Sequence, residues 1–193
     1  ILKRFGVETT YYDPLIGADI GSLLRPNTSV VFTESPGSHT FEVQDIPAIS
    51  KITHAHGAKI LMDNTWASPL FFKPFEHGVD VSIQAATKYI VGYSDVMLGT
   101  VTATKEAWPE LRDCTGDMGQ CAGPDDLYLA QRGFRSMAVR LRQHQANALL
   151  IAGWLQTRPE VRQVLYPALP GAPGHEIWKR DFLGASGLFA FEL

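Results

Sequence analysis

Four short runs of β-branched and other apolar residues recur through the first 103 residues of the chain, at 29–33, 59–62, 79–83 and 96–101. Such runs predict strands, and segments with helical spacing separate the first three. Asp45 offers an N-cap for a helix that ends before Gly57, and 71–77 predicts a short helical crossover closed by Gly78. Strands joined by helical crossovers predict an α/β fold with a doubly wound, mostly parallel sheet in three layers.

Beyond residue 103 the pattern becomes helical. We predict two short helices at 105–113 and 124–131 and a long helix at 134–156. Residues 166–174 are rich in turn-forming residues and are expected to be irregular. This change divides the chain into two predicted parts. Residues 1–134 belong to a large domain, and residues 135–193 form a linking helix and the beginning of a smaller α+β domain. Because the chain starts without methionine and stops in a run that reads as a strand just beginning, 187–193, we expect an internal fragment of a longer protein.

The composition, 45% hydrophobic and 19% charged residues, is typical of a folded protein, and the net charge of -3 offers no basic field for nucleic acid. No apolar run approaches the roughly 18 residues of a membrane span, and the first residues do not resemble a secretory signal. We therefore expect a cytoplasmic protein. The spacing of Cys114 and Cys121 fits neither a zinc motif nor a disulfide framework, so we predict buried or half-buried thiols and no metal centre.

Asp63 and Lys88 each come shortly after a predicted strand, and each has a threonine beside it, Thr65 and Thr87. The carboxyl ends of parallel strands meet at one edge of a sheet, where ligands gather, so these side chains are expected to converge. An acid, a hydroxyl and an amine suit pyridoxal phosphate: they can hold its ring nitrogen protonated, bind its phosphate and form a Schiff base with its aldehyde. Position alone, however, fits a strand-end cap at Asp63 and a solvated amine at Lys88 better.

Motifs distributed along the whole chain decide between these interpretations. They are Thr-Glu-Ser-Pro-Gly-Ser at 33–38, Asp-Asn-Thr-Trp-Ala at 63–67, Ser-Ile-Gln-Ala-Ala-Thr-Lys-Tyr at 82–89 and Gly-Tyr-Ser-Asp at 92–95, followed by segments at 131–135, 140–144 and 174–182. With these motifs the chain resembles the transsulfuration family of fold-type-I pyridoxal phosphate enzymes, and the resemblance covers the full sequence.

The resemblance implies a role for each of the four side chains. Lys88 would be the Schiff-base lysine and the general base, Asp63 the partner of the pyridine nitrogen, Thr65 a residue near the cofactor ring and Thr87 a phosphate ligand. The reaction implied is β-elimination on a thioether amino acid, with cystathionine as the expected substrate and homocysteine, pyruvate and ammonia as products. Such a carbon-sulfur lyase would serve methionine biosynthesis.

Two departures from the family pattern bear on the type of reaction. Ala86 stands where many relatives carry serine, and Gly37, Ser38 and His39 follow Glu-Ser-Pro where many relatives continue with Asn-Pro. Both departures match the β-lyase branch of the family. γ-Elimination, γ-replacement and a catalytically incomplete fragment that acts as a scaffold stay open as alternatives.

The resemblance also implies groups that this chain does not supply. These are a glycine-containing phosphate loop, a tyrosine stacked on the cofactor, an arginine for the substrate carboxylate, and a tyrosine and an arginine from a neighbouring subunit of a homotetramer with shared active sites. We therefore expect the chain alone to bind cofactor weakly or not at all and to have little activity. A basic stretch, Arg132, Arg135, Arg140, Arg142 and His144, is expected to meet acidic partners within the protein or an oligomer.

Overall fold

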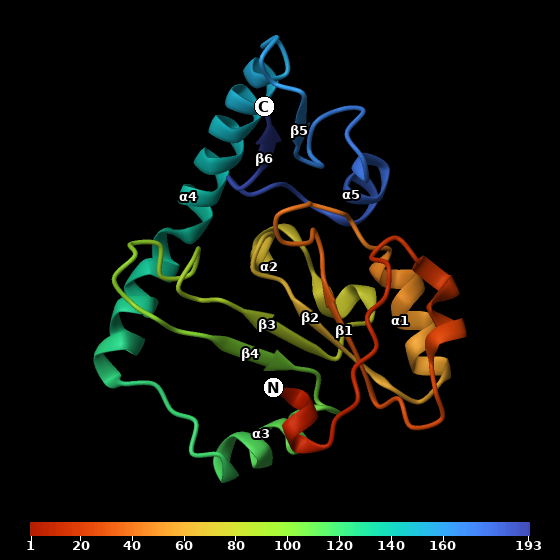
Figure 1. The fold of residues 1–193 in the computed structure, drawn as a ribbon. Coiled ribbons are helices and arrows are strands. Elements are labelled where there is room, and N and C mark those ends of the chain that lie inside the picture. Colours follow the sequence, from red (N-terminus) through yellow and green to blue (C-terminus); the bar gives the residue numbers. More distant parts are fainter.

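The computed structural model describes residues 1–193 and contains a central four-stranded sheet with helices around it (Figure 1). The strands lie in the order β1 (Val30–Glu34), β2 (Lys59–Asp63), β3 (Val81–Gln84) and β4 (Thr100–Ala103). The first three are parallel to one another, and β4 is antiparallel to β3. The register pairs Glu34 with Asp63 and Asp63 with Ile83, so the carboxyl ends of the parallel strands lie side by side. The predicted α/β fold is confirmed.

The fourth predicted strand is displaced along the chain. Residues 96–99, the start of the predicted run, form a loop, and the strand begins at Thr100. Within the loop, Leu98 gives both of its backbone polar groups to Thr87: its carbonyl accepts from the Thr87 N–H at 3.0 Å, and its N–H donates to the Thr87 hydroxyl at 2.8 Å. Because these groups bond to a loop residue, Leu98 cannot take part in a strand ladder.

The helices near the sheet begin and end where their caps indicate. Asp45 caps α1 (Ile46–Ala55) by accepting a hydrogen bond from the Ala48 N–H at 3.1 Å, as its position predicted. The predicted crossover is two short pieces, α2 (Ser68–Phe71) and a 3-10 helix (Pro74–His77) closed by Gly78 at φ 84°. Pro74 causes the break, because the residue before a proline disfavours helical torsions. Two further 3-10 helices occur, at Leu2–Phe5 and Gly17–Leu23.

Two predictions about the helices after the sheet are wrong. The predicted helix at 105–113 is α3 (Trp108–Asp117), which starts later because Pro109 occupies its first turn. The segments 124–131 and 134–156 form one continuous helix, α4 (Pro124–Leu155). Gly133 does not interrupt it, because the helix packs so closely there that a Cβ atom on Gly133 would lie 1.9 Å from the Val91 carbonyl oxygen.

Both cysteines are exposed, which contradicts the prediction of buried or half-buried thiols. Cys114 lies on α3, which buries none of its residues, and Cys121 lies in the loop that leads to α4. This part of the chain therefore gives a thiol no core to enter. No helix of the structure is both long enough and apolar enough to span a bilayer.

The C-terminal part contains β5 (Gln163–Leu165), α5 (His175–Asp181) and β6 (Ala190–Glu192), with β5 and β6 antiparallel. Residues 166–174 between β5 and α5 are irregular, as predicted. Helix α4 runs from beside the sheet to this part (Figure 1). A single core of 24 buried residues spans both, with Ile60 of β2, Leu141 of α4 and Tyr166 after β5 among its members. The division into residues 1–134 and 135–193 stays a prediction.

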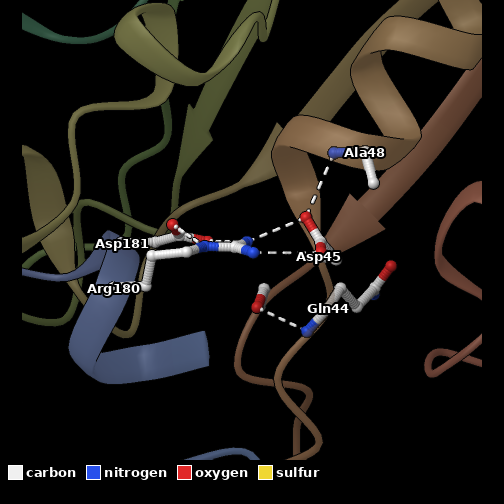
Figure 2. Close-up of polar contacts among 6 residues, drawn as sticks. Gln44, Asp45, Ala48, Arg180 and Asp181 are labelled. Carbon is white, nitrogen blue, oxygen red and sulfur yellow. Dashed lines mark hydrogen bonds and ion pairs between the residues drawn. The ribbon is translucent and has the colours of Figure 1, made fainter. Parts of the chain in front are cut away.

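A charged network joins α5 to the start of α1 (Figure 2). The Arg180 guanidinium donates to both carboxylate oxygens of Asp45, at 2.8 and 3.2 Å, and to both oxygens of the neighbouring Asp181, at 2.6 and 2.7 Å. Next to Asp45, the Gln44 N–H donates to the buried Ser35 hydroxyl at 3.0 Å. The network therefore connects the C-terminal part to the loop that follows β1.

Candidate active site

A cavity of about 760 Å³ opens at the carboxyl edge of the sheet. The loops after β1, β2 and β3 form most of its wall, and α4 contributes Arg140 and His144. All four residues singled out from the sequence line this cavity: Asp63, Thr65, Thr87 and Lys88. The structure thus brings them together at the place where an α/β sheet typically binds its ligand.

Asp63 and Thr65 are tied to each other and to the neighbouring strand. Asp63, the last residue of β2, accepts a hydrogen bond from the Thr65 N–H through Oδ1 at 2.8 Å. The Thr65 hydroxyl oxygen in turn accepts from the Ala85 N–H, just after β3, also at 2.8 Å. These two bonds hold the carboxylate in a defined place between two strand ends. They leave the second Asp63 oxygen and the Thr65 hydroxyl proton available to a ligand.

The Thr87 hydroxyl is engaged twice. It accepts from the Leu98 N–H at 2.8 Å and donates to the Leu98 carbonyl at 3.2 Å. The second bond is long, so the hydroxyl proton can turn towards a phosphate oxygen at the cost of a weak interaction. The role of Thr87 as a phosphate ligand stays a prediction.

Lys88 lies at the start of a tight turn on the cavity wall. Its N–H donates to the Ala85 carbonyl and its carbonyl accepts from the Gly92 N–H, both at 2.9 Å. Its side chain is exposed and takes part in none of the ion pairs of the molecule. The backbone of Lys88 is thus held firmly while its amine is free to react.

Sequence reasoning treated Arg140 and His144 as part of a basic stretch and did not connect them with the site. Their spacing of four residues puts them on one face of α4, and this spacing was the one feature of the sequence that indicated a shared position. The expected acidic partners occur for Arg132, which pairs with Asp95 at 3.5 Å, but Arg140 bonds to neutral oxygens instead. Tyr89, in the turn that begins at Lys88, also lines the cavity, with its ring 5.9 Å from that of His144, and burial raises the pKa of its phenol.

Two aromatic residues near the site have different surroundings. Trp66 lines the cavity and is buried, and its indole N–H donates to the Leu188 carbonyl at 2.9 Å. Tyr93 is exposed, with the guanidinium groups of Arg132 and Arg140 over its ring. Trp66 is thus part of the wall, whereas Tyr93 belongs to the packing between the turn after Lys88 and α4.

The available side chains fit pyridoxal phosphate at two of its three functional ends. Lys88 supplies an unpaired amine for an aldehyde, and the open oxygen of Asp63 can accept a hydrogen bond from a protonated ring nitrogen. At the phosphate end this chain offers the Thr87 hydroxyl. The cavity is large enough for a cofactor together with an amino-acid substrate.

Known proteins match the chain along its whole length. A family model described as "Cys/Met metabolism PLP-dependent enzyme" matches residues 1–193. The chain is 52% identical over 195 residues to cystathionine β-lyase MetC of Escherichia coli K12, and 49% identical over 195 residues to cystathionine β-lyase of Haemophilus influenzae. It covers 49% of the length of each, so it spans about half the length of these curated relatives.

The fold is also that of solved enzymes. The crystal structure of cystathionine γ-lyase from Lactobacillus plantarum, complexed with L-serine, superposes with a TM-score of 0.96 at 33% identity. The match covers 100% of this chain and 51% of that one. Sequence and fold therefore lead to one assignment: the chain belongs to the family of pyridoxal-phosphate-dependent enzymes of cysteine and methionine metabolism.

Proposed function

We propose that this chain carries the cofactor lysine and the ring-binding acid of a carbon-sulfur lyase that cleaves cystathionine into homocysteine, pyruvate and ammonia. The observation that carries the proposal is the common cavity of Asp63 and Lys88, which lie after adjacent parallel strands. The names of the relatives from Escherichia coli and Haemophilus influenzae support the type of reaction.

Pyridoxal phosphate, when bound, supplies an aldehyde for attachment and an aromatic ring that accepts the electrons released at the substrate α-carbon. Lys88 would hold the cofactor through its ε-amine and, once released by the substrate, would take up the α-proton as a general base. The Asp63 carboxylate would keep a proton on the ring nitrogen by a charge-assisted hydrogen bond. Thr65, anchored to the Ala85 N–H, would contact the ring, and Thr87 would donate its hydroxyl proton to the phosphate.

The proposal concerns the whole enzyme, since the chain spans about half the length of its curated relatives. The phosphate loop, the stacking tyrosine and the substrate-carboxylate arginine would come from outside residues 1–193, and further groups from a neighbouring subunit of a homotetramer in the cytoplasm. Residues 1–134 would belong to the large cofactor-binding domain, and residues 135–193 to the linking helix and the start of the small domain.

γ-Elimination is the second candidate, because a cystathionine γ-lyase shares the fold with a TM-score of 0.96. Backbone similarity therefore cannot separate the two reactions. The residues that favour β-elimination are Ala86 and the run Gly37-Ser38-His39 after the Glu-Ser-Pro motif. Gly37 and Ser38 line the cavity.

A chimera tests the proposal. Residues 1–193 replace the matching segment of Escherichia coli cystathionine β-lyase, whose 52% identity makes correct folding of the hybrid reasonable to expect. We expect the chimera to release pyruvate from cystathionine, with the 2-oxo acid product identified by chromatography and mass spectrometry. Lys88→Ala in the same chimera should lower the rate by several orders of magnitude, because both the attachment and the base are lost. Release of 2-oxobutanoate in place of pyruvate would show γ-elimination, and a fully active Lys88→Ala chimera would refute the assignment.

A further inference from the structure

Arg140 is a half-buried arginine in α4 whose guanidinium bonds only to neutral oxygens. It donates to the carbonyls of Tyr89 at 2.8 Å and Gly133 at 3.0 Å, and through Nε to the Ser136 hydroxyl at 3.0 Å. A longer contact of 3.5 Å reaches the Ile90 carbonyl. Partial burial of this guanidinium costs desolvation free energy, and no ion pair offsets that cost. Its position therefore needs another explanation.

The oxygens that Arg140 binds outside its own helix belong to the turn that begins at Lys88. That turn is closed by the bond from the Gly92 N–H to the Lys88 carbonyl at 2.9 Å. Gly92 has φ 82°, and a Cβ atom there would lie 2.3 Å from the Arg140 guanidinium carbon. The turn is therefore built directly against the guanidinium, and only glycine fits at this point of contact.

Further contacts press the same segment onto α4. The Val91 carbonyl lies against Gly133, where even a methyl group could not be placed. Tyr93 carries the guanidinium groups of Arg132 and Arg140 over its ring, at 5.5 and 5.7 Å from the centroid. The turn thus rests on the helix over its whole length, and Arg140 is the residue that bonds to its backbone next to Lys88.

We propose that Arg140 is a positioning residue: by binding the Tyr89 carbonyl it fixes the turn from which the Lys88 amine enters the cavity. The inference rests on the proposed function, since it concerns the orientation of the cofactor lysine. A planar guanidinium suits this role because Nη2 donates to the Tyr89 carbonyl of the turn while Nε of the same rigid plane donates to Ser136 of the helix, an arrangement that a lysine ammonium cannot reproduce. A misplacement of a reacting group by about 1 Å is enough to cost about 100-fold in rate.

The test uses the chimera in which residues 1–193 replace the matching segment of Escherichia coli cystathionine β-lyase, with added pyridoxal phosphate; the parent is the chimera with residues 1–193 unchanged. Borohydride reduction fixes the pyridoxyl group on the lysine that carries it, and peptide mass spectrometry gives the fraction on Lys88 relative to the other lysines. The variants are Arg140→Ala and Arg140→Lys. Arg142→Ala, a change at an exposed arginine in the same helix, is the matched control.

We expect Arg140→Ala to lower the fraction on Lys88 at least about tenfold, Arg140→Lys to lie between Ala and the parent, and Arg142→Ala to label like the parent. Guanidinium ion, at a concentration far below that which unfolds the chimera, should restore labelling of Arg140→Ala, whereas the same concentration of sodium chloride should not. Amide hydrogen exchange at Gly92 should speed up in Arg140→Ala.

The outcomes distinguish a failure of the proposed function from a failure of the positioning role alone. If the parent chimera carries no label on Lys88, the proposed function fails, and this inference with it. If the parent is labelled and both Arg140 variants label Lys88 to the same extent, only the positioning role is overturned. A loss of labelling that guanidinium does not restore, together with unchanged exchange at Gly92, also contradicts positioning, because the turn would then be held without Arg140.

Discussion

Replacing Arg180 with methionine removes the charge that joins α5 to α1 while keeping most of the apolar stem. In the parent chain Arg180 bonds to both oxygens of Asp181, whose side chain is only 4% exposed, and to both oxygens of Asp45, whose side chain is 28% exposed. The substitution therefore leaves one buried carboxylate without its partner and one partly exposed carboxylate with only its bond to Ala48.

The expected cost follows from these two different environments. Removing one partner of a buried ion pair costs about 3–5 kcal/mol, and the lower end applies because Arg180 itself is 50% exposed. The link to Asp45 adds at most about 1 kcal/mol, as for exposed pairs. We expect the free energy of unfolding to fall by about 3 kcal/mol, which shifts the urea midpoint by about 1 M for a chain of this size.

Urea unfolding followed by circular dichroism measures this loss, with Arg162→Met as the matched control. Arg162 is 80% exposed and pairs loosely with Glu192 at 3.7 Å, so its replacement should change stability by less than about 0.5 kcal/mol. Adding Asp181→Asn to Arg180→Met should recover part of the loss, because the unpaired buried charge disappears. An unfolding free energy that falls no further for Arg180→Met than for Arg162→Met would contradict this role of Arg180. A double variant less stable than Arg180→Met alone would contradict it as well.

Two further predictions concern the same framework. The Arg180 guanidinium beside Asp45 lowers the pKa of that carboxyl. The ionised carboxylate therefore contributes its full stabilisation above about pH 4, and this contribution is lost as the pH falls through the lowered pKa. The difference in unfolding free energy between the parent chain and Asp45→Asn, measured by urea unfolding, should be constant near neutral pH and shrink in acid. Gly133→Ala should destabilise the chain by about 2 kcal/mol or more in thermal unfolding, because the new Cβ atom would lie 1.9 Å from the Val91 carbonyl oxygen. The control is Gly153→Ala in the same helix, where the space around the Cβ position is open. This change should be neutral or stabilising by up to about 1 kcal/mol.

Local sequence signals were enough to predict the sheet edge that carries the site. Strand propensity, Asp45 as a cap and the glycine that closes the crossover each act within a few residues, and they place Asp63 and Lys88 after adjacent strands. The family resemblance then added the chemistry. The four residues that were singled out line one cavity for this reason, although their individual roles are still proposals.

The features that sequence did not predict depend on contacts between distant segments. The continuity of α4 through Gly133 requires the Val91 carbonyl, and the start of β4 depends on the bonds between Leu98 and Thr87. The part played by Arg140 required knowledge that α4 lies against the turn after Lys88. No periodicity within a single segment contains this information.

The most direct test of the central claim is the site of cofactor attachment. The chimera of residues 1–193 with Escherichia coli cystathionine β-lyase is incubated with pyridoxal phosphate, reduced with borohydride and digested, and the peptide that carries the pyridoxyl group is sequenced by mass spectrometry. We expect Lys88 to carry the pyridoxyl group and Asp63→Ala to weaken the labelling, because both side chains line one cavity. Attachment mainly at another lysine, with Lys88 unmodified, would contradict the account.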